Sequence, residues 1–362
     1  MRLSTGGGDI AGKAVSARLG RQVVSWGESL FIQGGIASAQ APLDATKASI
    51  PGVELKEIFL PVGQLYVQAD LSDSLSVEGY HQYEWAATRL DAAGSYFSTS
   101  DYLDEGGESL ILAPGFAATR GSDADASDSG QWGVALRYLA DERLNHTEFG
   151  LYYANYHDKL PQLNLDMATA SYNLSYMEDI HLLGASFGTV IGNTNVSGEI
   201  SYRENAPVMA VDATALLGFK MQRAEVLQTQ VSAVHLFGEN ALMDDLSLTF
   251  EAGVNKVLDM KGDELVNDRS AWGYSATITP KYFVLFPGVD LDLPISFSQG
   301  VNGISSALGT FTEDKNKLGI NARFTYLSDY QLQVGYTNFL GSSSENNQAD
   351  RDFISLSLKT TF

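Results

Sequence analysis

The sequence of 362 residues contains no cysteine, and this absence removes several kinds of chemistry. Without thiols the chain has no disulfide framework, no thiolate metal site and no cysteine nucleophile. No apolar run approaches the ~18–20 residues that a transmembrane helix requires, which excludes a helical membrane protein. A membrane-spanning β-barrel stays open, because its apolar signal is spread over many short alternating strands.

Basic residues are also scarce: 23 lysines and arginines stand against 44 aspartates and glutamates, a formal net charge of −21. Phosphate binding depends on Lys and Arg, so this balance argues against a nucleic-acid partner. The hydrophobic share of 44% is ordinary for a folded protein, which argues against disorder. A chain of this length could form two domains or one large all-β unit.

The sequence is rich in apolar–polar alternation with a period of two, which predicts β-strands. The 17 tyrosines and 17 phenylalanines strengthen the strand tendency. Residues 352–362 show the pattern best: one face carries Ile354, Leu356, Leu358 and Phe362, and the other carries Ser355, Ser357, Lys359 and Thr361. In all, the pattern predicts about fourteen strands, at residues 14–26, 64–71, 76–85, 130–139, 146–156, 180–190, 195–203, 225–237, 245–258, 271–285, 290–298, 317–327, 331–340 and 352–362.

The predicted connections alternate between tight turns and long loops. Turns lie near 72–75, 140–145, 191–194, 238–244, 286–289 and 328–329, and loops cover 27–63, 86–129, 157–179, 204–224, 259–270, 299–316 and 341–350. Such alternation is typical of an antiparallel up-and-down barrel with unequal ends, whereas a Greek-key sandwich would disrupt it. We therefore expect one all-β barrel over residues 1–362, with bulges or strand ends at Pro280 and Pro294.

The connection 27–63 differs from the other long loops because it is rich in apolar residues, among them Phe31, Ile32, Leu55 and Phe59. An apolar loop of this size would not remain in water, so we expect an insert folded into the barrel mouth or lumen. Pro51 stands where a short helix can begin.

Three features favour a membrane barrel, which is apolar outside and polar inside, over a soluble barrel with the opposite arrangement. About fourteen strands enclose too wide a space for side chains to fill, since ~8 strands already reach that limit. Charged groups on the polar faces, such as Glu78, Glu84, Glu199 and Arg203, cannot be packed dry without partners. Aromatic residues near strand ends would form interfacial girdles: Trp26, Trp85, Trp132, Trp272, Tyr326 and Phe362.

Residues 18–29, with the sequence RLGRQVVSWGES, resemble the proteobacterial outer-membrane proteins of domain-of-unknown-function family 1302. Further blocks agree in order along nearly the whole chain: PGVELKE at 51–57, LSVEGY at 75–80 with Glu84 and Trp85, YFSTSDY at 96–102, TEFGLYY at 147–153, YMEDI at 176–180, SGEISYR at 197–203 and YTNF at 336–339. The resemblance implies a barrel in the outer membrane of a Gram-negative bacterium. It also implies the handling of hydrophobic or amphipathic compounds, sometimes beside inner-membrane exporters of the resistance-nodulation-division type, and it carries over no catalytic motif.

The beginning of the chain departs from that family, whose members usually carry a signal peptide and several more strands before the block 18–29. Residues 1–8 have no apolar core and no cleavage site. We therefore expect either that an export signal has been removed or that the chain begins inside a longer protein, whose full barrel would have about 16–18 strands.

The main site candidates lie in the block 18–28 and at residues 54–57. Arg18 and Gln22 share the polar face of the first predicted strand, while the connection 27–63 carries Glu28, Glu54, Lys56 and Glu57. We expect these groups to pin the apolar insert against the wall and to leave a hydrophobic patch for a lipophilic solute. The alternative is a fixed salt-bridge network without a ligand. Glu78, Glu84, Glu199 and Arg203 complete the set of lumen or gate candidates.

The sequence predicts no catalytic, cofactor-binding or metal site. No two of the five histidines, which are His81, His146, His157, His181 and His235, are spaced as a metal motif. The acidic runs 101–105 and 123–128 could bind Ca²⁺ or Mg²⁺ that bridges lipopolysaccharide, but a solvated loop is the simpler interpretation.

The leading expectation is a porin-like conduit in the outer membrane, not an enzyme, that passes hydrophobic or amphipathic small molecules by diffusion through a gated barrel. Its partners would be outer-membrane lipid, lipopolysaccharide, the solute itself, and periplasmic or inner-membrane transport components. An acidic lumen would favour cations or neutral solutes over anions. Two alternatives stay open: a barrel enzyme that acts on lipids, indicated by a His within reach of a Ser and a carboxylate, and a structural barrel that docks periplasmic partners, indicated by a plugged lumen.

Overall fold

The computed structural model describes residues 3–10, 12–50, 53–260, 262, 264–307, 311–343 and 346–360. Its main feature is an antiparallel sheet of 16 strands that are neighbours in chain order. These strands are β1 (Ser4–Ile10), β2 (Lys13–Gln22), β3 (Val62–Ser72), β4 (Leu75–Gln82), β7 (Trp132–Leu139), β8 (Glu148–Tyr156), β11 (Ile180–Ile191), β12 (Thr194–Val211), β13 (Phe219–Leu236), β14 (Asp245–Asp259), β15 (Ser270–Phe286), β16 (Val289–Asp292), β17 (Ile295–Asn302), β18 (Asn316–Tyr326), β19 (Tyr330–Leu340) and β20 (Phe353–Thr360). The predicted all-β, up-and-down barrel architecture is confirmed.

A second sheet of 4 strands, in the order β5-β6-β10-β9, is built from two of the long connections. Its strands are β5 (Ser109–Ala113), β6 (Phe116–Arg120), β9 (Gln162–Asp166) and β10 (Ser171–Ser175). In the large sheet, the described residues of β1 pair only with β2, and those of β20 pair only with β19. β1 and β20 are therefore the first and last strands in the order of the large sheet.

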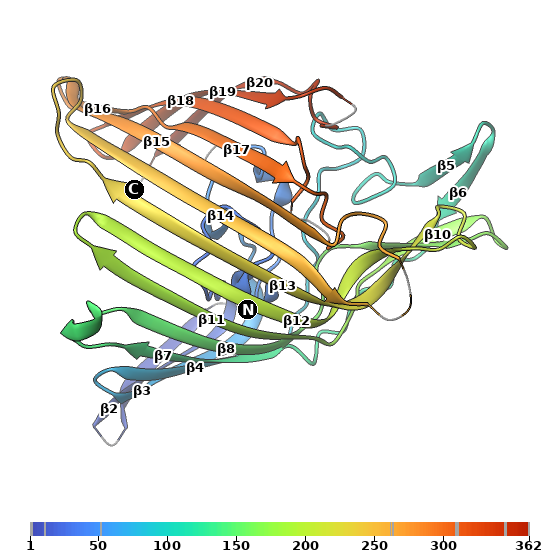
Figure 1. Cartoon of the computed structure of the whole chain (residues 1–362), viewed down its shortest axis with the longest axis horizontal. Coiled ribbons are helices and arrows are strands. Elements are labelled where there is room, and N and C mark those ends of the chain that lie inside the picture. The colour runs from blue at the N-terminus through green and yellow to red at the C-terminus, as the bar shows by residue number, and fades with distance from the viewer. Residues whose placement is uncertain are drawn as a thin grey trace.

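The connections of the large sheet are short at one end and long at the other. Figure 1 shows the tight turns on the left and the long connections, together with the small sheet, on the right. Residues 192–193 and 287–288 are turns of the first kind, whereas 260–269 and 303–315 join strands at the opposite end. The predicted alternation is thus confirmed, and in bacterial outer-membrane barrels the long loops lie at the extracellular end.

The two faces of the large sheet differ in polarity. On β12, Glu199, Ser201 and Arg203 are at most 7% exposed, whereas the intervening Ile200 is 43% exposed. The three large aliphatic residues of β20 are at least 75% exposed. Polar groups therefore line the inner face and apolar groups the outer face, which is the arrangement of a membrane barrel.

A charge on this outer face should destabilise the fold. Val254 is 43% exposed on the outer face of β14, and we expect Val254→Arg to lower the free energy of unfolding in lipid vesicles by about 2–4 kcal/mol. Thr249→Arg, on the inner face of the same strand, is the matched control and should cost clearly less. Urea unfolding of both variants measures the difference, and equal losses would contradict the assigned faces.

The prolines, β1 and the connection between β12 and β13 account for the main differences from the predicted strands. The long loop predicted at 204–224 is mostly strand, because β12 continues to Val211 and β13 begins at Phe219. The pattern does not predict β1, because its sequence STGGGDI lacks alternating apolar residues, yet it pairs with β2 over its whole length. Pro294 divides the predicted strand 290–298 into β16 and β17. Pro280 stays inside β15, at the point where pairing with β17 ends and pairing with β16 begins, and its carbonyl accepts a hydrogen bond from Leu293 N. Its missing N–H therefore faces an interruption of the ladder.

The long connection between β2 and β3, residues 23–61, forms the insert, which Figure 1 shows inside the curve of the large sheet. Its short helices are η1 (Ile36–Ala39), η2 (Ala45–Lys47) and α1 (Leu55–Ile58). No described helix is long and apolar enough to cross a membrane. Pro51, the predicted helix start, lies outside the described residues, and α1 begins at Leu55 with a capping box between Glu54 and Glu57.

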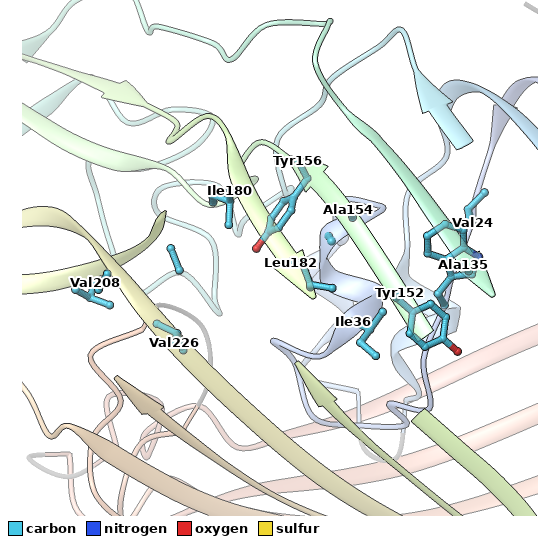
Figure 2. Packing of buried hydrophobic residues seen from close by; sticks show 14 of the residues in the cluster. Val24, Ile36, Ala135, Tyr152, Ala154, Tyr156, Ile180, Leu182, Val208 and Val226 are labelled. Atoms are coloured by element: carbon cyan, nitrogen blue, oxygen red, sulfur yellow. The ribbon is translucent and has the colours of Figure 1, made fainter. Parts of the chain in front are cut away.

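Apolar packing joins the insert to the inner face of the sheet. Figure 2 shows Ile36 of η1 pointing toward Leu182 of β11 and Tyr152 of β8 in one buried cluster. A second buried apolar cluster lies within the insert itself: Ala37, Ala41, Leu43, Leu55, Ile58 and Phe59. Of the apolar residues that set this connection apart in the sequence, Ile32, Leu55 and Phe59 are therefore buried, and Phe31 is half-buried.

The aromatic girdle is only partly as predicted. Trp132, Trp272 and Tyr326 are 40–46% exposed on the outer face. Trp85 instead lies in the long loops, where its ring contacts Tyr176, and Phe362 lies outside the described residues. The expectation for Trp26 is wrong, because its ring is 2% exposed and packs inside the sheet.

Candidate functional site

Glu199 of β12 holds the first part of the insert. Its carboxylate accepts hydrogen bonds from the backbone N–H of Glu28 at 2.5 Å and of Ile36 at 2.9 Å, and from the Ser29 hydroxyl at 3.0 Å. Arg203, two inward positions further along β12, donates from Nη2 to the carbonyl of Gly35 at 3.0 Å. Two residues singled out in the sequence, Glu199 and Arg203, thus bind the insert directly.

Glu251 of β14 holds the next turn of the insert. Its two oxygens accept from three successive backbone N–H groups: Leu30 at 3.0 Å, Phe31 at 2.6 Å and Ile32 at 2.7 Å. Successive N–H groups that converge in this way form an anion-binding concavity, and hydrogen bonds to a carboxylate are stronger than those to neutral acceptors. Here the anion is the Glu251 carboxylate of the sheet itself. The sheet therefore fixes the position of this part of the insert.

Two glycines allow this close approach. Gly27 has φ +84°, and a side chain there or at Gly35 would collide with the Glu199 carboxylate. Gly27 lies in the block 18–29 that carries the family resemblance. Because glycine has no side chain, it leaves room for the Glu199 carboxylate, and this gives the block a structural role.

Four further side chains, three on strands of the large sheet and Lys159 on the loop after β8, donate to carbonyls of the insert. Gln82 donates to Gln40 at 2.5 Å, Lys159 to Ala39 at 3.1 Å, Gln228 to Gln33 at 2.8 Å and Lys317 to Ala48 at 2.9 Å. The insert is therefore bound at both kinds of backbone group, N–H and C=O, and along most of its described length.

Trp26 closes the insert against the opposite side of the sheet. Its ring lies 5.0 Å from that of Tyr80 and 5.8 Å from that of Tyr152, between centroids, and its Nε1 donates to Glu78 at 2.6 Å. Glu78 also pairs with Arg137 at 2.7 Å. The lumen candidate Glu78 thus orients the buried tryptophan.

Glu28 is the titratable group of the insert with the largest shift. Burial raises the pKa of its carboxyl to about 7; Arg137 opposes the rise, while Glu199 and Glu148 add to it. Its backbone N–H is bound to Glu199, so the side chain lies where negative groups gather. Glu28 is therefore partly protonated near neutral pH.

A cavity of about 620 Å³ lies between the insert and the inner face of β15, β17, β18 and β19. The apolar wall comes from the insert: Phe31, Ile32, Ile50, Val53, Leu55 and Ile58. The sheet and the loop before β18 contribute polar groups, Ser275, Ser296, Ser298, Lys315, Asn316 and Lys317, together with the aromatic rings of Phe297, Phe311 and Phe339. The cavity volume falls in the range of about 300–1,000 Å³ typical of small-molecule sites, and the lining combines apolar and polar side chains.

The other candidates contact the wall or each other. The Arg18 guanidinium lies 4.3 Å from the centre of the Tyr66 ring, and Gln22 donates to the carbonyls of Arg18 and Gln64. These contacts lie within the wall, so the pinning expected of Arg18 comes instead from Glu199 and Glu251.

The candidates at 54–57 are local to α1, and Glu84 lies at the end of the wall. Glu54 forms an ion pair with Lys56 at 2.5 Å, and the Glu57 carboxylate accepts from the Glu54 N–H at 3.0 Å. Glu84 pairs with Arg21 at 3.4 Å and accepts from Gly63 N at 2.6 Å. Sequence reasoning missed Glu251, Lys315 and Lys317 as site residues, although Glu251 and Lys317 lie on the polar faces of predicted strands.

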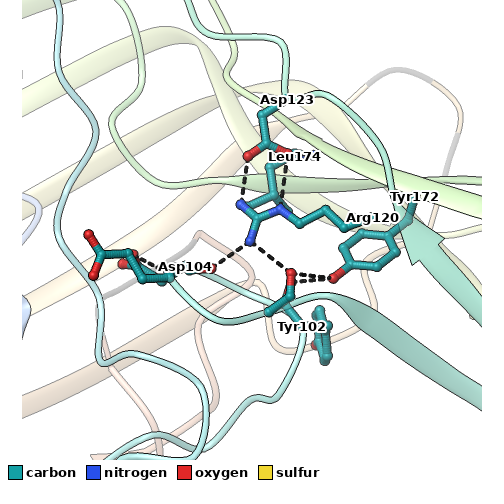
Figure 3. Close-up of polar contacts among 8 residues, drawn as sticks. Tyr102, Asp104, Arg120, Asp123, Tyr172 and Leu174 are labelled. Atoms are coloured by element: carbon teal, nitrogen blue, oxygen red, sulfur yellow. Dashed lines mark hydrogen bonds and ion pairs between the residues drawn. The ribbon is translucent and has the colours of Figure 1, made fainter.

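The acidic loops form a local polar network rather than a ligand cluster. Figure 3 shows Arg120 between Asp123, to which it bonds at 2.6 Å, and the loop at Asp104. Burial acts to raise the pKa of Asp123, but hydrogen bonds from Arg120 and the Leu174 N–H hold it below its usual value. No group of three or more His, Asp or Glu in the described part of the chain is arranged to hold a metal ion.

The histidine contacts are structural in kind. His157 contacts the backbone of Ser129 and Asp179, His181 contacts Tyr153, and His235 contacts Thr194. The run 184–188 does match the Gly-x-Ser-x-Gly pattern, yet it lies within β11, and the Ser186 hydroxyl bonds to Tyr152. A nucleophile elbow needs a sharp strand-to-helix turn. Ser186 lies within a strand and therefore does not have this backbone context.

The chain matches one family model over nearly its whole length. A family described as "Protein of unknown function (DUF1302)" matches residues 4–362. Among solved structures, a triple mutant of the Rhodopseudomonas blastica porin is similar at 11% identity and a TM-score of 0.39, with 99% of this chain and 89% of that chain covered. Outer-membrane expressed OmpT of Vibrio cholerae is similar at 13% identity and a TM-score of 0.34, with 83% and 84% covered. No curated protein matches.

Proposed function

We propose that this chain, which belongs to the DUF1302 family, forms a passive conduit in the Gram-negative outer membrane for hydrophobic or amphipathic small molecules. The apolar outer face and polar inner face of the sheet support a place in a membrane. The long-loop end would face outward, and outer-membrane lipid and lipopolysaccharide would surround it.

The cavity, whose lining is both apolar and polar, carries this proposal. A purely polar pore offers nothing to an apolar solute, whereas the insert presents six apolar side chains to a cavity of about 620 Å³. The serines, asparagine and lysines of the lining are wettable, so an amphipathic solute can satisfy both kinds of group at once. The insert would act as a selective constriction, and solutes would diffuse through it down their concentration gradient.

Filling the cavity should stop passage of lipophilic solutes. In cells that produce the protein, we expect uptake of the lipophilic dye N-phenyl-1-naphthylamine to exceed that of cells without it, and Ser298→Trp to return uptake to that background. Ser298 faces the cavity, and a tryptophan there would occupy it. Ser247 lies on the inner face of β14 and does not line the cavity. Ser247→Trp is therefore the matched control and should retain uptake.

Deletion of residues 30–60 gives the complementary test. It removes the apolar wall, so selectivity for the dye should be lost while swelling of liposomes in small sugars becomes faster. Unchanged dye uptake in both Ser298→Trp and the deletion would refute the conduit.

A further inference from the structure

Two lysines give the cavity a charge opposite to that of the chain. Lys315 and Lys317 both line it, against the single carboxylate Asp91 among the described lining residues. The chain as a whole carries a formal charge of −21. An acidic lumen is expected to favour cations, but this expectation does not hold in the cavity.

Neither lysine has an ion-pair partner among the described residues. Elsewhere on the inner face, Arg137 pairs with Glu78 and Glu148, at 2.7 and 2.6 Å, and Arg323 pairs with Asp292 at 3.8 Å. Arg203 and Arg18 instead bind the Gly35 carbonyl and the Tyr66 ring. Lys317 instead donates to the carbonyl of Ala48 at 2.9 Å, and this contact fixes its amine at the boundary between insert and wall. Lys315 and Lys317 are two positions apart in the chain and both line the cavity, so their like charges repel each other.

Such an arrangement is unfavourable without a counter-charge. An ammonium group beside an apolar wall loses hydration, and a like charge nearby adds to the penalty. An anion between the two amines would offset both effects through charge-assisted hydrogen bonds. The uncompensated charge lies next to six apolar side chains of the insert, so the anion and the apolar body can belong to one molecule.

We propose that the cavity binds an amphipathic organic acid, whose carboxylate is held by Lys315 and Lys317 and whose apolar body lies against the insert. This inference rests on the proposed conduit and narrows its solutes to acids. Lys317 is the positioned contact because its amine donates to the Ala48 carbonyl, and Lys315 lies at the end of the loop that precedes β18.

Binding of decanoate, decanol and acetate to the purified protein in lipid nanodiscs tests the inference. Calorimetric titration, corrected with empty nanodiscs, should show saturable binding of decanoate, weaker binding of decanol and no binding of acetate. The double variant Lys315→Gln/Lys317→Gln should weaken decanoate binding at least tenfold, because two charge-assisted contacts are lost, and leave decanol binding unchanged.

Two further variants keep the result independent of misfolding. Lys315→Arg/Lys317→Arg retains both charges and should retain decanoate binding. Lys281→Gln removes a lysine that pairs with Asp245 at 3.3 Å away from the cavity lining, and it should behave as wild type. Equal decanoate affinity in the wild type and the Gln double variant, or decanol binding as tight as decanoate binding, would overturn the inference.

The same proteins, assayed for uptake in cells, separate this inference from the conduit. Dye uptake without lysine-dependent decanoate binding would refute the organic-acid site and leave the proposed conduit in place. Lysine-dependent binding without any uptake would refute the conduit and support the acid site.

Discussion

Replacing both Glu199 and Glu251 by alanine should release the insert and raise the passage of small hydrophilic solutes. The two carboxylates together accept from five backbone N–H groups of the insert. Each hydrogen bond to a charged group contributes about 1.5–3 kcal/mol, and their effects are not additive, so we expect the docking of the insert to weaken by more than about 3 kcal/mol.

Amide hydrogen exchange at residues 28–36 and liposome swelling in sugars measure the two parts of this expectation. Exchange should become much faster in Glu199→Ala/Glu251→Ala, because the donors lose their acceptors. Glu148→Gln is the control, since Glu148 pairs with Arg137 and makes no contact with an N–H of the insert among the described hydrogen bonds. Unchanged exchange in the double variant would show that apolar packing alone holds the insert.

Trp26→Ala should have the largest effect of any single substitution on stability. Trp26 is 2% exposed, packs on Tyr80 and Tyr152, and donates to Glu78. Replacing a buried Phe or Trp by Ala costs about 3–5 kcal/mol, because packing is lost and a cavity remains. Urea unfolding in lipid vesicles should show this loss.

Two comparisons identify its origin. Trp26→Phe keeps a ring but removes the Nε1 donor, so about 1–3 kcal/mol should be lost. Trp132→Ala, on the outer face, removes a ring that is 40% exposed and should cost less than Trp26→Ala. A Trp26→Ala variant as stable as Trp132→Ala would contradict the buried role.

Strand positions and the polarity of their faces could be predicted because both depend on local alternation. On β12, the order of Glu199, Ile200 and Ser201 alone indicates which side chains share a face. The insert could be predicted for a related reason, since its apolar residues are visible in the sequence whatever they contact. β1 could not, because its glycine-rich sequence pairs by backbone hydrogen bonds that need no side-chain pattern.

Trp26 shows where local reasoning fails. Its place beside a strand end suggested an interfacial ring, yet the chain turns inward after β2 and carries it into the sheet. Glu199 and Arg203 lie on the polar face of a predicted strand, but their partners at residues 28–36 could not be named from the sequence.

The sequence by itself determined an up-and-down barrel with an apolar exterior, a polar interior and one apolar insert, because these follow from period-two patterning and loop length. Only the tertiary structure decided what holds the insert and what lines the cavity. Phe31 and Glu251 are 220 positions apart, and Lys317 and Ala48 are 269 apart. Contacts at such separations depend on the register and curvature of the whole sheet, which no local pattern encodes.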